Sequence, residues 1–232
     1  DSRSDKEMLD EAVQAARQAD VIVAAIGETS EFSGECSSRS DLTIFDAQKD
    51  LLTALKATGK PVVLVNFSGR PTVMNWENAN FPAILNVWFG GSEAGDAICD
   101  VLFGDKVPSG RLTVSMPKSV GQIPIYYNHL NTGRPQPEGR PFEKFRSNYI
   151  DIDNNPLYPF GYGLSYTTFK YGPLQLDATS MTADGQIKVT VPVTNTGSRD
   201  ADEVVQLYLH DVAASIARPV KELKDFARIS LH

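Results

Sequence analysis

The strongest constraint on the fold is the alternation of short, continuously apolar segments with segments of helical hydrophobic periodicity. Three apolar runs, VIVAAI (21–26), PVVLVNF (61–67) and AILNVWF (83–89), have the length and composition of buried strands. Runs that are apolar at nearly every position are typical of parallel strands covered on both faces. We therefore expect a layered α/β sandwich with a mostly parallel sheet in the first part of the chain.

Helical segments precede and separate these predicted strands. Residues 4–7 (SDKE) have the pattern of a capping box, and apolar residues then recur at helical spacing to about residue 19. A second helix is predicted over 44–57. A third is predicted to begin at Ser92 as its N-cap and to end at Gly104.

The pattern changes after Gly110, where prolines, glycines and aromatic residues indicate a long irregular segment. Apolar and polar residues then alternate over 187–193 and 204–209, as in antiparallel strands. The recognisable strands are fewer than the roughly seven of a complete immunoglobulin-like domain, so we expect an incomplete β-sandwich. We divide the chain into an α/β domain at 1–160 and a linker with a β-domain at 161–232, and expect both to belong to a longer protein.

Composition and charge exclude several classes of function. The net charge is −7 and no Lys/Arg cluster is present, which argues against nucleic-acid binding. No apolar run approaches the roughly 20 residues that span a bilayer, so no membrane partner is expected. The histidines and cysteines show no ligand spacing, so we predict no metal site and no cofactor. Whether Cys36 pairs with Cys99 is left open.

Two long motifs, WFGGSEAGDAICDVLFGDKVPSGRLTVSMP (88–117) and LYPFGYGLSYTTF (157–169), resemble the C-terminal α/β domain of glycoside hydrolase family 3. The segment QIPIYYNHLNTGRP (122–135) is most similar to the bacterial periplasmic β-glucosidases of that family. The resemblance covers nearly the whole chain. It implies a (β/α)8 barrel, a six-stranded α/β sandwich and a fibronectin type III-like domain, of which the sandwich and part of the last domain are expected here.

The resemblance also implies that the two catalytic carboxyl groups come from different domains. In the family a barrel aspartate is the nucleophile, and a glutamate on a sandwich-domain loop is the general acid/base. Retaining hydrolysis uses two such carboxyl groups about 5–5.5 Å apart. The chain is therefore predicted to belong to an exo-acting retaining β-glucosidase that removes terminal non-reducing glucose from β-glucosides. It is expected to be inactive without its barrel partner, and to act in the periplasm or outside the cell.

The loop GETSEFSGECSSRSD (27–41) follows the first predicted strand and lies where the acid/base belongs. It carries three carboxylates, Glu28, Glu31 and Glu35. Aligning SSRSDLTI with the family segment after the acid/base puts Glu35 in register with that residue. Glu28 ends the strand directly, so we interpret it as a loop or helix-cap carboxylate. Glu31 is the third candidate.

Two neighbours of Glu35 are predicted to bind substrate. Phe32 would stack on a sugar ring at the leaving-group side or pin the loop to the barrel. Arg39 would hold Glu35 or a sugar hydroxyl through its planar fork, and the alternative is a surface ion pair of little energy. Cys36 is interpreted as a small buried thiol, not a nucleophile. Family members often have proline where Phe45 stands, which concerns the start of the next helix.

Other functions remain as alternatives. Within the family, β-xylosidase and N-acetyl-β-glucosaminidase differ through barrel residues that this chain lacks. Outside it, a non-catalytic carbohydrate-binding or scaffolding module would use the same fold. A nucleotide-binding domain is disfavoured because the GxxxxGK[ST] pattern is absent. A homodimer is left open.

Overall fold

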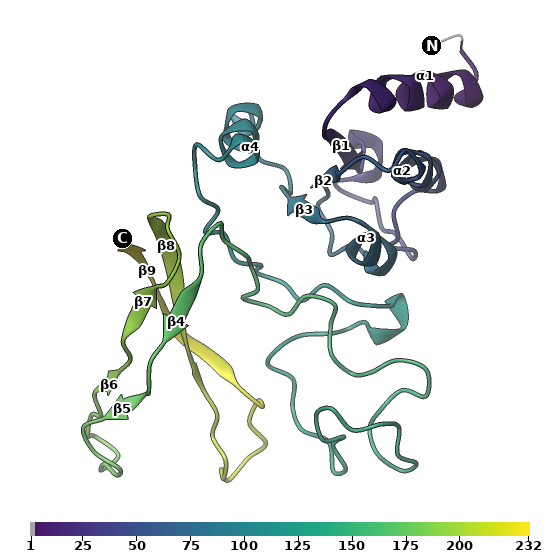
Figure 1. Ribbon diagram of the computed structural model, residues 1–232. Helices are drawn as coiled ribbons and strands as arrows, with labels where there is room; N and C mark the ends of the chain where they lie inside the picture. The colour runs from purple at the N-terminus through teal and green to yellow at the C-terminus, as the bar shows by residue number, and fades with distance from the viewer. Residues whose placement is uncertain (1–2) are drawn as a thin grey trace.

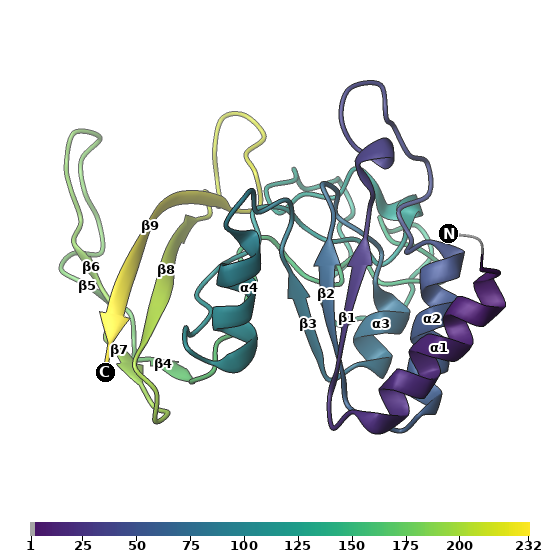
Figure 2. The same cartoon turned by 90° about the horizontal axis from the view of Figure 1, so that it is seen from above.

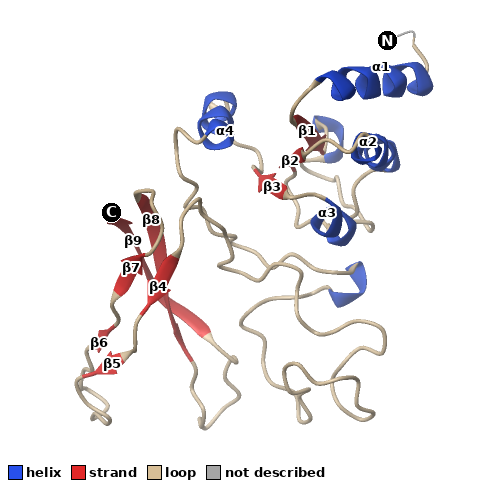
Figure 3. Ribbon diagram, viewed as in Figure 1, coloured by secondary structure: helices blue, strands red, loops and turns tan. Residues whose placement is uncertain are grey.

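The computed structural model describes residues 3–232 and consists of an α/β part and a β part joined by a long irregular segment (Figures 1 and 3). The α/β part contains α1 (Asp5–Gln18), β1 (Ile22–Gly27), η1 (Ser30–Phe32), α2 (Asp46–Ala57), β2 (Val62–Phe67), α3 (Asn75–Asn80), β3 (Ala83–Asn86) and α4 (Ala94–Phe103). The predicted alternation of helix and strand is confirmed.

Three parallel strands form the sheet in the order β1-β2-β3. Ile22 lies opposite Val62, and Val63 lies opposite Ala83. Helices α1, α2 and α3 cover one face, and α4 lies on the other face, between the sheet and the β part (Figures 1 and 2). The parallel layer is as predicted, but the described residues supply three strands to this sheet where the resemblance implied six.

The hydrophobic core lies between the sheet and α1 to α3, and Leu52 and Leu64 are fully buried there. Along β1, Ile22, Ala24 and Ile26 face this core. Residues on the opposite side of β1 are exposed, and Val23 keeps 50% of its surface. The expectation that β1 is covered on both faces is therefore wrong, because β1 is an edge strand and α4 leaves its outer face open.

The helix ends follow the sequence signals in part. The Ser4 hydroxyl accepts from the Glu7 amide at 3.3 Å, and the Glu7 carboxylate accepts from the Ser4 amide at 2.8 Å, which is the predicted capping box. At α4 the N-cap is Glu93 and no side chain caps the helix, so the expected cap at Ser92 is wrong. Gly104 ends α4 as predicted, with a left-handed φ of 83°.

The β part consists of three antiparallel pairs, β4 with β7, β5 with β6 and β8 with β9. The predicted strand over 187–193 is broken into two, because Pro192 has no N–H for a ladder and its carbonyl oxygen accepts from Gly172. The strands are β4 (Phe169–Tyr171), β5 (Gln175–Leu176), β6 (Val189–Thr190), β7 (Val193–Asn195), β8 (Ala201–Leu209) and β9 (Glu222–Leu231).

Aromatic and charged contacts hold the β part to the irregular segment. Tyr127 stacks on Phe160 with ring centroids 4.3 Å apart and meets the edge of Tyr208 on β8 at 5.8 Å. Arg111 forms an ion pair with Glu203 of β8, and both side chains are nearly buried. The boundary placed at residue 160 remains a prediction.

Candidate active site

The loop that follows β1 rises beyond the carboxyl end of the sheet (Figure 2). Gly27 makes this exit possible, because a Cβ atom there would lie 1.8 Å from the Phe67 carbonyl oxygen. The Gln48 side chain of α2 accepts from the Gly27 amide at 3.0 Å and donates to its carbonyl oxygen at 2.8 Å. The start of the loop is therefore fixed to both β2 and α2, which points the following residues over the sheet edge where open α/β sheets bind ligands.

Glu35 lies exposed in this loop. Within residues 3–232 its carboxylate has neither a hydrogen-bond donor nor an ion-pair partner. Its neighbour Cys36 adopts a left-handed backbone, with φ at 60°. The Glu35 carboxyl group is thus accessible to a group supplied from outside this chain.

The interpretation of Cys36 as a buried thiol is wrong. Its side chain is exposed, because the left-handed turn at Cys36 lies in a loop that stands clear of the core. Cys99 is also exposed, and both cysteines are free.

Arg39 does not hold Glu35 in this structure. Its Nη1 donates to Glu28 Oε1 at 2.8 Å, and its Nη2 donates to the Thr43 carbonyl oxygen at 3.1 Å. The alternative of a surface ion pair does not describe this contact either, because the Glu28 side chain is 1% exposed and that of Arg39 15%. A contact between Arg39 and a sugar remains a prediction.

Glu28 is the centre of a buried polar cluster. Its Oε1 also accepts from Arg70 Nη1 at 2.6 Å, and its Oε2 accepts from the Ser68 hydroxyl at 3.0 Å. Glu28 lies at the start of the loop and is buried, but it caps no helix, so only the helix-cap alternative is wrong. We call Glu28, Arg39, Ser68 and Arg70 the Glu28 cluster.

The charge of Glu28 is stabilised by its partners. Burial by itself would raise the pKa of this carboxyl group, but hydrogen bonds from Arg39, Ser68 and Arg70 outweigh burial and lower the pKa below its ordinary value. Glu28 is therefore an ionised carboxylate at neutral pH, balanced by two guanidinium groups.

Arg70 was not singled out from the sequence, although it is the residue that connects this cluster to the loop. Its Nη1 donates to the Phe32 carbonyl oxygen at 2.7 Å, and its Nη2 donates to the Ser37 carbonyl oxygen. One signal was available, because SGR directly follows the second apolar strand and neighbouring parallel strands end at the same sheet edge.

Phe32 is 44% exposed and packs beside the start of α2. Its ring centroid lies 4.8 Å from that of Phe45 at an interplanar angle of 47°. The Arg39 guanidinium lies 4.3 Å from the Phe45 ring centroid. The exposed part of Phe32 leaves room for the predicted stacking on a sugar, which remains a prediction.

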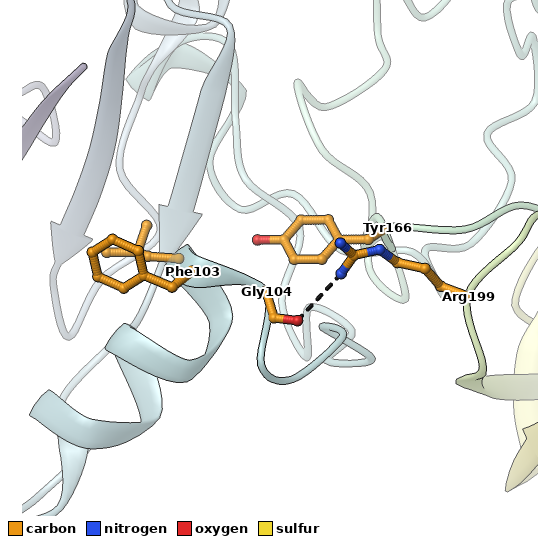
Figure 4. Close-up of a pocket in the computed structure, with 5 residues that line it drawn as sticks. Phe103, Gly104, Tyr166 and Arg199 are labelled. Carbon is orange, nitrogen blue, oxygen red and sulfur yellow. Dashed lines mark hydrogen bonds between the residues drawn. The ribbon is translucent and has the colours of Figure 1, made fainter. Parts of the chain in front are cut away.

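A separate hollow of about 360 Å³ lies where α4 meets the β part, and Figure 4 shows its lining. Its polar groups already have partners, since Arg199 donates to the Gly104 carbonyl oxygen at 3.2 Å and the Tyr166 hydroxyl to that of Val101 at 2.7 Å. We interpret this hollow as a contact between the two parts, because neither polar side chain is left to orient a ligand.

In residues 3–232 no three or more His, Cys, Asp and Glu side chains are grouped so that they could hold a metal ion. No helix in the same range is long and apolar enough to cross a membrane.

Comparison with known proteins first gives the class, a glycoside hydrolase with a C-terminal α/β domain and a following β-domain. The family model described as "Glycosyl hydrolase family 3 C-terminal domain" matches residues 2–166, and that of a fibronectin type III-like domain matches 203–232. The chain belongs to glycosyl hydrolase family 3.

Individual relatives agree with this assignment. The chain is 56% identical over its whole length to a periplasmic beta-glucosidase of Salmonella typhimurium, and covers 30% of that protein. It is 46% identical, over 97% of its length, to a beta-xylosidase of Formosa agariphila, again covering 30% of it. A crystal structure of a beta-glucosidase from Listeria innocua in complex with glucose superposes with a TM-score of 0.93 at 41% identity, covering 99% of this chain and 32% of that one. The chain therefore spans about a third of the length of these relatives.

Proposed function

We propose that this chain is the part of a retaining, exo-acting β-glucosidase that supplies the general acid/base Glu35. The observation that carries the proposal is the position of Glu35, exposed on a loop that stands beyond the carboxyl end of the parallel sheet. The similarity to the Salmonella periplasmic beta-glucosidase over the whole chain supports the same assignment. A (β/α)8 barrel elsewhere in the protein would supply the nucleophile and most of the sugar-binding residues.

In this mechanism Glu35 acts twice. Its carboxyl group first donates a proton to the glycosidic oxygen while the barrel carboxylate attacks the anomeric carbon, so the aglycone leaves as an alcohol. Its carboxylate then takes a proton from the water that hydrolyses the glycosyl-enzyme. Phe32 and Arg39 would line the leaving-group side. The chain by itself would be inactive because only one carboxyl group of the pair is present.

The test compares the full-length enzyme with its Glu35→Ala variant on two β-glucosides, one with an activated and one with a poor leaving group, with and without azide. We expect a severe loss for the poor leaving group and a milder loss for the activated one, because a good leaving group needs little protonation. Azide should partly restore turnover by replacing activated water. Unchanged kinetics would contradict the role of Glu35 and direct attention to Glu31, since Glu28 is buried.

A β-xylosidase is the second candidate, and the relative from Formosa agariphila favours it. Comparison of kcat/KM for matched aryl β-glucoside and aryl β-xyloside substrates would separate the two. We also propose a periplasmic or secreted location, which the name of the Salmonella relative supports. Fractionation of the source cells tests that location. A homodimer remains a prediction, which light scattering on the full-length protein would test.

A further inference from the structure

The backbone around Glu35 has few contacts of its own. Between Ser30 and Ser37 the loop contains one short 3-10 turn, and its local hydrogen bonds include long ones, with the Ser37 amide 3.4 Å from the Gly34 carbonyl oxygen and the Ser37 hydroxyl 3.4 Å from that of Glu35. Most side chains of this stretch are exposed. Local structure alone therefore constrains the position of Glu35 only weakly.

Arg70 supplies the missing constraint from a different element. It donates to the carbonyl oxygens of Phe32 and Ser37, which lie on either side of Glu35 in the sequence. Arg70 follows β2, the central strand of the sheet, and its amide donates to the Ser68 hydroxyl at 3.1 Å. The two ends of the segment that carries Glu35 are thus tied to one guanidinium group attached to the most central strand.

Glu28 determines how this guanidinium group is directed. The planar fork of arginine has a fixed donor geometry, so a carboxylate that accepts from one edge orients the remaining donors. Glu28 accepts from Arg70 at 2.6 Å and from Arg39 at 2.8 Å, and Arg39 in turn donates to the Thr43 carbonyl oxygen. One buried carboxylate therefore fixes two arginines, which together bind three backbone carbonyl oxygens between β1 and α2.

We infer that Arg70, oriented by Glu28, is a positioning residue that holds the loop so that Glu35 reaches the glycosidic oxygen. The inference rests on the proposed function of Glu35. Arg70 itself contacts backbone oxygens and the Glu28 carboxylate, so its effect on turnover passes through Glu35. A displacement of about 1 Å at a reacting group lowers a rate by roughly 100-fold.

The experiment uses the full-length enzyme with Arg70→Lys and Arg70→Ala, measured on the two β-glucosides described above. Lysine retains a positive charge beside Glu28 but cannot reproduce the fork. We expect kcat/KM for the poor leaving group to fall by roughly 100-fold, with a smaller loss for the activated one. The control is Arg111→Ala, which removes an arginine of similar burial (12% exposed against 18%) from a buried ion pair remote in sequence from the loop. It should affect both substrates equally.

A double-variant cycle separates positioning from a general effect on the fold. In a Glu35→Ala background, Arg70→Lys should cause no further loss in kcat/KM, because the group that it positions is gone. Equal losses for both substrates, or full additivity with Glu35→Ala, would overturn the inference. Should Arg70→Ala fail to fold, Arg70→Lys decides the question alone.

The same data distinguish failure of the inference from failure of the proposed function. If Glu35→Ala itself shows no dependence on the leaving group, Glu35 is not the acid/base and both statements fall. If Glu35→Ala shows that dependence and Arg70→Lys does not, only the positioning role of Arg70 is lost.

Discussion

The ring centroid of Phe32 lies 4.8 Å from that of Phe45, the N-cap residue of α2. The aromatic residue that is expected near the sugar therefore also packs against the start of this helix. Phe45 is the N-cap of α2, and its φ of −59° is one that proline adopts without strain. The Arg39 guanidinium, 4.3 Å from the same ring, completes the packing. Phe45 therefore both begins the helix and packs against the loop, whereas a proline at this position would begin the helix without that packing.

Phe45→Pro should preserve α2 and remove this aromatic contact. Pairs of this kind contribute about 0.5–1.5 kcal/mol beyond their buried area, so we expect a loss of about 1 kcal/mol in the free energy of unfolding. The measurement is a double-mutant cycle with Phe32→Ala, in which each free energy of unfolding comes from denaturant unfolding of the full-length protein. If the effects of Phe32→Ala and Phe45→Pro simply add, the two rings do not stabilise each other.

The sequence predicted most elements of the α/β part, but it did not predict α3, β4, β5 or β9, and it predicted the long-range partners poorly. The apolar runs of β1 and β2 mark both as strands, although only β2 is buried at most of its positions, as a strand inside a parallel sheet is. The ion pair between Glu28 and Arg70 joins residues 42 positions apart, and local patterns contain no information on which charged groups meet. The burial of Glu28 therefore could not be predicted, and neither could the part played by Arg70.

Periodicity also indicates which helix face is apolar without saying what covers it. The spacing of the apolar residues in α4 predicts a stripe that faces inward (Ala94, Ala97, Ile98, Val101 and Leu102), yet no residue of this helix is fully buried. Phe103 retains 80% of its surface and Ile98 is half-buried. The helix itself is found where predicted because its amphipathic spacing and its C-terminal Gly104 are local signals.

Glu28→Gln should change how stability depends on pH. The partners of Glu28 keep its folded pKa below the ordinary 4.5, so the stability it contributes is present above that value and is lost as pH falls through the folded pKa. The variant leaves two buried guanidinium groups without their counter-ion, and breaking such a pair costs about 3–5 kcal/mol. We expect the gap in unfolding temperature between the parent and Glu28→Gln to be large at pH 7 and to narrow toward pH 3.

A gap that stays constant between pH 7 and pH 3 would show that the Glu28 charge contributes nothing to stability. Glu138→Gln, at an exposed position, serves as the matched control and should leave the profile unchanged.

Glu77→Gln should have the opposite dependence. The Glu77 residue of α3 is 3% exposed, and burial raises the pKa of its carboxyl group, with its own backbone amide and Lys49 acting only partly against this. A raised pKa means that stability is present below the unfolded value and is lost as pH rises through the folded pKa. We therefore expect Glu77→Gln to gain thermal stability relative to the parent on going from pH 4 to pH 7. A difference in unfolding temperature between Glu77→Gln and the parent that stays constant from pH 4 to pH 7 would contradict this.

The chain expressed without the rest of the protein should self-associate. Val21, directly before β1, and Val23 of β1 are about half-exposed, and within residues 3–232 the outer edge of β1 pairs with no further strand. Open strand edges with apolar side chains promote pairing between molecules, and an inserted charge suppresses it. Light scattering on the isolated chain should detect oligomers, and Val23→Lys should reduce them. A monodisperse monomer at micromolar concentration would show that the edge is protected.

Glu203 of β8 connects the irregular segment to the β part. Its carboxylate accepts from Arg111 of the irregular segment and, at 2.7 Å, from the Tyr171 hydroxyl of β4. Glu203 is 7% exposed, so Glu203→Gln leaves Arg111 as a poorly solvated charge without a counter-ion. Tyr171→Phe removes one hydrogen bond to a charged group and should lower the free energy of unfolding by at most about 3 kcal/mol.

We expect the β part of Glu203→Gln to unfold at a lower temperature than the α/β part, because the buried ion pair attaches β8 to the irregular segment. Calorimetry of the full-length protein should show this as an added early transition. Arg228→Ala is the control, since its ion pair with Asp202 lies on the same strand pair but is exposed and worth at most about 1 kcal/mol. An unchanged calorimetric profile in Glu203→Gln would show that the remaining contacts, among them the aromatic contacts of Tyr127 and the hydrogen bond from Arg199 to Gly104, hold the β part without the Glu203 charge.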